Sequence, residues 1–347
     1  MRTFFYEELK HLLLPMEIVS LLSKINEFKG KQELYKKQSP QILNTLKNVA
    51  VIQSTKASNA IEGIVITDKR LHTIMANKTD PFDRSEGEIA GYRDVLNLVH
   101  ASHEAIPVNE KVILQLHRDM YKYVTAEGGR WKHDDNVISE KLPTGEKRIR
   151  FVPVSAFETP KAMEDLSLAF KERAAKQDID PLILVAVFIL DFLCIHPFND
   201  GNGRMARLLS LLLLYHFGYE VGRFISLEKI IEESKESYYE TLRKSSIRWH
   251  KNQHDSLPWV TYFLSTILRA YKELEERVGV VITGKGNKAA RVEEFIENKL
   301  GFFTKEDIRS ACPDVSESTI NRVLNHLKEQ KQIIPTGKGR SAKWKKL

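Results

Sequence analysis

Apolar positions recur at helical spacing along most of the chain, which predicts a mainly α-helical fold. One such face follows Ser39-Pro40, where serine suits the helix cap and proline the first helical position. Further amphipathic patterns cover residues 86–100, 112–123 and 160–174. Strand signals are sparse, and no repeat of 20–50 residues suggests a solenoid.

Two segments are apolar almost all round, residues 181–195 and 204–217, and we expect both to be buried helices. The first opens with an Asp-Pro start signal and is interrupted by Asp191, and the continuous apolar stretch of the second is too short to cross a bilayer of ~30 Å. Neither therefore predicts a membrane span. The short polar loop between them has the character of a site held on a rigid scaffold.

One hairpin is expected over residues 136–152, with a turn at Leu-Pro-Thr-Gly. Residues 284–288 have the composition of a linker. Beyond them, three helical patterns (291–300, from Thr304, and 316–329) precede a short basic hairpin at 332–344. That order is typical of a winged helix-turn-helix domain.

The cysteine content and the charge indicate in which compartment the protein works and which kind of partner it binds. The 347 residues include two cysteines, Cys194 and Cys312, which excludes a disulfide-stapled secreted domain and favours a reducing compartment. The N-terminus lacks the pattern of a signal peptide, so we expect a cytoplasmic protein. The net charge is +7, and residues 285–347 carry 14 Lys and Arg against 8 Asp and Glu. This basic end suggests an acidic partner, with nucleic acid the first candidate.

The polar loop, HPFNDGNGRMAR at residues 196–207, combines several features that suit phosphate chemistry. It feeds a helix N-terminus, where free N–H groups favour an anion, and its glycines allow close approach. Arg204 and Arg207 share one face of the first turn and suit phosphate oxygens. Asp200 suits Mg²⁺, and His196 is a base for a hydroxyl proton. A lone histidine or a lone Gly-Asn-Gly would be read as structural, but the combination favours phosphoryl or nucleotidyl transfer to a hydroxyl.

The loop matches the Fic signature HPFx(D/E)GNGRxxR at every specified position, and the chain resembles Fic proteins over roughly residues 34–267. The resemblance implies a helical enzyme that transfers AMP from ATP to a Ser, Thr or Tyr hydroxyl of a target protein, or of itself, and releases pyrophosphate. It also implies three parts: an N-terminal helical region (1–110) carrying an inhibitory motif, a catalytic core (111–283) and a winged-helix domain (284–347). A homodimer is a further expectation.

The resemblance assigns a role to each part of the loop. His196 would be the general base, Asp200 would hold Mg²⁺, and Phe198 would anchor the loop in the core. The remaining positions would bind ATP: the anion cradle of the Gly201-Asn202-Gly203 backbone with the Asn202 side chain, then Arg204, Met205, Ala206 and Arg207, with both arginines on the outer phosphates.

A second segment, Ser58-Asn-Ala-Ile-Glu62-Gly63, fits the family's inhibitory motif (S/T)xxxE(G/N). The implied mechanism is that Glu62 pairs with Arg207 where the γ-phosphate should lie, so that ATP binds weakly or unproductively. Taken alone the pattern is short, and an ordinary helix end capped by Gly63 is the other interpretation.

Two further regions resemble parts of the Fic nucleotide and target sites. The hairpin at 136–152 resembles the flap that binds an extended target segment, and Val137 would touch the nucleotide. Tyr238 and Tyr239 would line the adenine pocket, although two tyrosines on a half-buried helix are an equal alternative. His117 is expected to be structural.

Two rival functions remain open. Some relatives transfer UMP, phosphocholine or phosphate, because the cradle recognises phosphates rather than the base. The other rival is a DNA-binding regulator whose Fic part only senses nucleotide. The C-terminal domain could equally dock a protein instead of DNA.

Overall fold

The computed structural model describes residues 6–38, 40–76, 79–124, 128–141, 147–282, 288–299, 301–312, 315–336 and 343–346. The chain divides into two compact units, and the loop at 196–207 lies in the first. The first unit comprises Met1–Gln32 and Val49–Tyr271, and the second comprises Glu33–Asn48 and Lys272–Leu347. The predicted fold class is confirmed in its coarser form, because the described chain is mainly helical with small antiparallel sheets.

The elements up to the hairpin follow in the order η1 (Tyr6–His11), α1 (Met16–Gln38), α2 (Pro40–Ile61), α3 (Asp68–Met75), α4 (Arg84–Ser102), η2 (His103–Ala105), α5 (Glu110–Met120), β1 (Ile138–Lys141) and β2 (Lys147–Phe151). After it come α6 (Thr159–Lys176), α7 (Pro181–Ile195), α8 (Asn202–His216), η3 (Val221–Arg223), α9 (Leu227–Glu233), α10 (Lys235–Ser246), η4 (Trp249–Lys251) and α11 (Leu257–Ile282).

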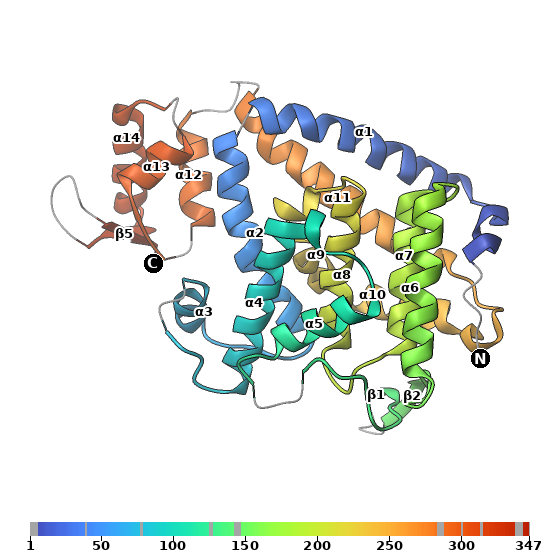
Figure 1. Cartoon of the computed structure of the whole chain (residues 1–347). Coiled ribbons are helices and arrows are strands. Elements are labelled where there is room, and N and C mark those ends of the chain that lie inside the picture. The colour runs from blue at the N-terminus through green and yellow to red at the C-terminus, as the bar shows by residue number, and fades with distance from the viewer. Residues whose placement is uncertain are drawn as a thin grey trace. The chain divides into compact units, whose positions relative to one another are not determined.

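The two apolar segments form the centre of the first unit, as predicted. From Leu182 to its end, every residue of α7 is buried, and Figure 1 shows α7 beside α6. The helix starts where the sequence indicates, because Asp180 accepts a hydrogen bond from the Leu182 amide and Pro181 occupies the first turn. Asp191 is fully buried in α7, and its carboxylate accepts hydrogen bonds from the Tyr6 hydroxyl at 2.8 Å and the Trp249 indole at 2.7 Å.

Two details of the first unit differ from the sequence patterns. Helix α5 ends at Met120, three residues before the apolar pattern does, because Tyr121 turns and its amide bonds back to the preceding carbonyls. The predicted hairpin is present, with Ile138 opposite Phe151 and a register irregularity between Ile138 and Ser139. Its predicted turn lies outside the described residues, as does Ser39 before α2.

The second unit holds the elements α12 (Lys288–Asn298), β3 (Phe302–Thr304), α13 (Lys305–Ala311), α14 (Glu317–Glu329), β4 (Ile333–Pro335) and β5 (Lys343–Lys346). The three predicted helices and the terminal strand pair are present, and the sheet order β3-β5-β4 adds a strand that the sequence pattern did not predict. Trp344 is buried in this unit's core with residues of α12 and α14. Most of the predicted linker, and Lys338 and Arg340 of the predicted wing, lie outside the described residues.

In the part of the chain that the structure describes, no helix is both long and apolar enough to cross a membrane.

Close packing of α4 on α5 supplies a stability test. A β-carbon at Gly91 of α4 would collide with the Met120 carbonyl at the end of α5. We predict that Gly91→Ala lowers the free energy of unfolding by about 1–3 kcal/mol in urea titrations, since backbone cannot move aside easily. Gly30 of α1 has open space around it, so Gly30→Ala should stabilise the protein by about 0.5–1 kcal/mol. Equal effects of the two substitutions would contradict this account of the α4–α5 contact.

Candidate active site

The loop between α7 and α8 is bounded by two residues in the left-handed region. His196 (φ 52°) ends α7 and donates its amide hydrogen to the Phe192 carbonyl at 2.9 Å. Gly201 (φ 82°) precedes α8, and a β-carbon there would press on Met120 and the Tyr121 ring. A non-glycine residue held at positive φ is typical of a functional site. The backbone conformation is therefore fixed at both ends of the loop, at His196 after α7 and at Gly201 before α8.

Phe198 anchors the loop in the core, as the resemblance implied. Its side chain is fully buried, and its ring stacks on the His117 ring with centroids 3.7 Å apart and planes 1° apart. The Trp131 ring lies on it at 5.3 Å. Parallel stacking of this kind fixes both the ring and the backbone that carries it.

The Asn202 side chain closes the loop on itself. Its amide oxygen accepts from the Phe198 amide at 2.9 Å, and its amide nitrogen donates to the Phe198 carbonyl at 2.8 Å. The side chain is buried and braces the loop in this way, and its expected contact with an anion, together with the backbone of residues 201–203, stays a prediction.

His117 holds the other side of the loop. Its Nδ1 accepts a hydrogen bond from the Gly129 amide at 2.9 Å, so the ring proton resides on Nε2, which donates to the Asp200 carbonyl at 3.1 Å. Burial lowers the pKa of His117 to about 4, which keeps the ring neutral. Its expected structural role is seen here in detail: it links α5 to the loop.

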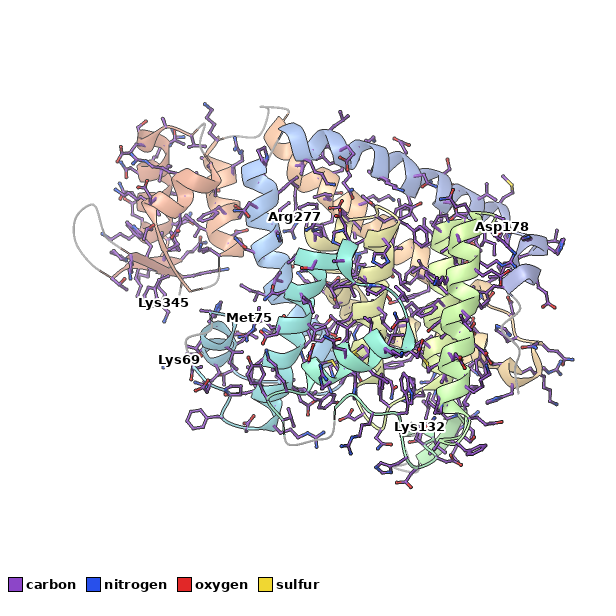
Figure 2. The ribbon with its side chains drawn as sticks, viewed as in Figure 1. Lys69, Met75, Lys132, Asp178, Arg277 and Lys345 are labelled. Atoms are coloured by element: carbon purple, nitrogen blue, oxygen red, sulfur yellow. The ribbon has the colours of Figure 1, made fainter. Side chains whose placement is uncertain are left out.

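Lys132 and Asn136 also hold the loop, and neither is among the site residues predicted from the sequence. Lys132, labelled in Figure 2, donates its ammonium hydrogens to the Ile195 carbonyl at 3.1 Å and to Asn136 Oδ1 at 2.9 Å. Asn136 donates to the carbonyls of His196 and Phe198. Burial lowers the pKa of Lys132 to about 8. These two residues satisfy loop carbonyls that the helix cannot reach.

His196 is half-buried and poised as a neutral base. Its Nδ1 lies 3.2 Å from the Leu193 carbonyl, an oxygen that can only accept, so Nδ1 carries the proton and Nε2 is the basic atom. Burial lowers the pKa of His196 to about 4, with the nearby Lys132 cation acting in the same direction. The imidazole is therefore unprotonated at neutral pH.

Arg207 of α8 is hydrogen-bonded to residues at and just after the end of α2. The guanidinium is 3% exposed, its Nε donates to the Ser58 hydroxyl at 2.8 Å, and its Nη2 donates both to the Ser58 carbonyl and to Glu62 Oε1, each at 2.8 Å. The ion pair predicted from the sequence is thus present. Arg207 Nη1 is buried and has no hydrogen-bond partner among the described atoms.

The Glu62 carboxylate also covers the start of α8. A β-carbon on Gly203 would collide with Glu62 Oε1 and would lie 3.2 Å from Arg207 Nη1. Only glycine leaves room for an anion here, and the carboxylate lies where the free amides and the dipole of a helix N-terminus attract negative charge. Gly63 (φ 82°) turns the chain just after this carboxylate, so the motif is also the end of α2.

Arg204 is buried and paired with α4. It is 1% exposed, its Nη1 lies 2.6 Å from the Glu88 carboxylate of α4, and its Nη2 donates to the Tyr121 hydroxyl at 2.7 Å. A buried guanidinium needs an anionic partner, and Glu88 supplies one. This pair ties α8 to α4, and the contact of Arg204 with the outer phosphates stays a prediction.

Asp200 offers one carboxylate at the loop surface. Its Oδ1 accepts from the Gly201 amide at 2.7 Å, and its Oδ2 accepts from Arg84 at 2.9 Å. Among the described residues no group of three His, Cys, Asp or Glu side chains could hold a metal ion. A single carboxylate fits Mg²⁺ when phosphates and water complete the shell, so Asp200 remains the predicted ligand.

The other side chains predicted to contact the nucleotide differ in how far they are exposed. The side chains of Met205 and Ala206 are buried in the core. Tyr238 is buried, whereas Tyr239 is half-buried, and burial together with the nearby Glu62 carboxylate raises the pKa of Tyr239 to about 12. Val137, just before β1, is 53% exposed. Lys235 of α10 donates to the Ile61 carbonyl and so joins α10 to the end of α2.

Comparison with known proteins finds relatives of the segment that holds this loop. Residues 107–214 match the model of the Fic/DOC family, so this segment is similar to Fic domains. Proteins named "Protein adenylyltransferase Fic" from Nematostella vectensis and Drosophila erecta are 25% and 24% identical to the chain over 255 and 269 residues. These matches cover 70% and 74% of this chain, and the chain spans about half the length of both relatives (52% and 50%).

Solved structures share the fold. A Fic family protein from Desulfovibrio desulfuricans G20 aligns with a TM-score of 0.62 at 22% identity, over 97% of each chain. A Fic domain containing signaling protein from Bacteroides thetaiotaomicron aligns with a TM-score of 0.59 at 23% identity, over 76% of this chain and 98% of that one.

The two loop imidazoles provide a pH test. We predict that His196 and His117 titrate near pH 4 in the folded protein, with the proton on Nδ1 of His196 and on Nε2 of His117. Both folded pKa values lie below the unfolded value near 6.5, so stability is full above about pH 6.5 and falls as the pH drops toward 4. Nitrogen-detected NMR across this pH range measures the pKa and the tautomer of each ring. A pKa near 6.5 for either ring, or the opposite tautomer, would refute the assigned hydrogen bonds.

Proposed function

We propose that this chain, through its Fic domain, is a protein adenylyltransferase that moves AMP from ATP to a hydroxyl of a target protein and is inhibited by its own Glu62. In the reaction the hydroxyl oxygen bonds to the α-phosphorus, the bond to the β-phosphate oxygen breaks, and pyrophosphate leaves. The hydroxyl proton passes to Nε2 of His196. The resemblance of the curated relatives to 70% of this chain supports AMP over other transferred groups.

His196 suits the role of general base because its protonation state and its position are both fixed. The Leu193 carbonyl holds the proton on Nδ1, which directs the lone pair of Nε2 away from α7. A pKa of about 4 makes the free imidazole a weak base, and the negative charge of a bound triphosphate would raise its pKa. The basicity of His196, and with it the rate of transfer, should therefore rise when the nucleotide binds.

The observation that carries the proposal is the anion already lying on α8. Glu62 contacts Arg207 and covers Gly203, so an acidic group fills a site shaped for an anion. A γ-phosphate at this place would compete with that carboxylate for the same guanidinium. We infer that ATP binds weakly or in an unproductive pose until Glu62 moves, which is the inhibition predicted from the sequence.

Asp200 is the proposed Mg²⁺ ligand, and the metal would neutralise the α- and β-phosphate charges. Its carboxylate is 57% exposed and bonded to Arg84, an exposed pair that contributes little stability and can be exchanged. Tyr238 and Tyr239 are proposed to line the adenine pocket, and Val137, just before the β1–β2 flap, is proposed to touch the nucleotide. Contact of the second unit with DNA or protein, and pairing of two copies, remain predictions.

We predict that Glu62→Gly raises automodification by ATP about 10- to 100-fold, because it removes one charge-assisted hydrogen bond of ~1.5–3 kcal/mol that competes with the nucleotide. The rate is measured with ATP labelled at the α- or the γ-phosphate. Label from the α-position alone, lost on adding His196→Ala, supports AMP transfer.

The matched control is Glu104→Gly, which removes an exposed carboxylate in η2 outside the site and should leave the rate unchanged. Label from the γ-position would establish kinase-like transfer instead. No labelling of any variant, together with salt-dependent DNA binding, would favour the nucleotide-sensing regulator.

A further inference from the structure

A strongly basic groove lies beside the flap and takes no part in the reaction described above. It has a volume of about 490 Å³ and is lined by residues 148–152 on β2 and just beyond it, by Arg243, and by residues 246–251 at the end of α10 and in η4. All of these residues belong to the first unit.

The lining carries five cationic side chains and no carboxylate: Arg148, Arg150, Arg243, Arg248 and Lys251. Arg243 is bound in a fork by Glu240, with two contacts of 2.7 Å, and Arg150 donates to the Tyr239 carbonyl. Arg248 and Lys251 are exposed. Glu140 of β1 is the cross-strand partner of Arg148, so two nearby acidic residues are known in the described part of the chain, against five cations in the lining. The groove therefore presents a positive field that attracts an acidic partner.

Exposed aliphatic side chains lie among these charges. Ile149, Val152 and Ile247 are 59%, 55% and 54% exposed. Of the aromatic rings in the lining, Trp249 is fully buried, and the half-buried Phe151 ring stacks on the exposed His250 ring at 5.4 Å with planes 7° apart. Nucleic acid would stack its bases on exposed aromatic rings, and His250, whose ring already stacks on Phe151, is the one exposed ring in this lining. Aliphatic contacts between cations suit a protein segment with alternating acidic and apolar residues.

The groove is connected to the reaction centre through the hairpin. Strand β2 pairs with β1, which begins two residues after Asn136, the residue that holds the carbonyls of His196 and Phe198. A segment bound along β2 is therefore held on the same hairpin that borders the catalytic loop.

We propose that this basic groove is a docking site for an acidic, aliphatic-containing segment of the target protein, and that it selects which proteins are modified. The selection rests on the proposed AMP transfer, whereas docking itself requires no ATP. Acidic targets gain local concentration at the flap, while the chemistry stays with His196 and its loop.

The test uses the full chain and two fluorescent peptides of equal length that contain serine and leucine, one with aspartate and glutamate at alternate positions and one with lysine there. We expect the acidic peptide to bind, with affinity that falls as salt rises, and the lysine peptide not to bind. Arg248→Glu/Lys251→Glu should weaken acidic-peptide binding at least tenfold. The control, Lys111→Glu/Lys171→Glu, makes the same charge change on exposed lysines of α5 and α6 and should not.

Three results would overturn the docking site: no binding of the acidic peptide, equal loss in both double variants, or tighter binding of a single-stranded oligonucleotide that alone depends on Arg248 and Lys251. Assays in the Glu62→Gly variant distinguish failure of the docking site from failure of the proposed AMP transfer. There, AMP transfer to the acidic peptide should show a raised KM and unchanged kcat in Arg248→Glu/Lys251→Glu, with automodification unaffected. Groove-dependent binding without any AMP transfer would reject the enzyme and keep the docking site.

Discussion

A guanidinium buried in α8 must have an anion beside it, and the site is organised around that requirement. Arg207 is 3% exposed, and its charge cannot be left unpaired without a large desolvation penalty. Ser58 and Glu62 at the end of α2 meet the requirement in the resting chain. The remaining donor, Nη1, is still without a partner among the described atoms. An arrangement of this kind binds one anion and retains capacity for a more highly charged one.

The rest of the loop is built so that this exchange takes place on a rigid support. Asn202, His117 and the Lys132–Asn136 pair each bind main-chain groups of residues 195–200, and Phe198 is packed between rings. These four polar side chains, Asn202, His117, Lys132 and Asn136, thus position backbone. Rigidity of the cradle leaves Glu62, which is 32% exposed, as the element with freedom to move.

The sequence predicted what depends on local chemistry. The start of α7 at Asp180-Pro181 and the burial of both apolar helices follow from caps and periodicity. The Glu62–Arg207 pair follows from the resemblance of residues 58–63 to the inhibitory motif of Fic proteins. It could not predict the partner of Arg204, because Glu88 is distant in sequence and only packing of α4 on α8 brings the two charges together. Lys132 and Asn136 were missed for the same reason: neither stands in a periodic pattern, and their role depends on where the loop carbonyls point.

The central claim is that Glu62 and the γ-phosphate compete for Arg207, and calorimetric affinities for ATP and ADP in the wild type and in Glu62→Gly test it most directly. The account predicts that loss of the carboxylate tightens ATP binding about tenfold or more and leaves ADP binding nearly unchanged, since only ATP brings the phosphate that replaces it. An equal gain for both nucleotides, or no gain for ATP, would contradict it.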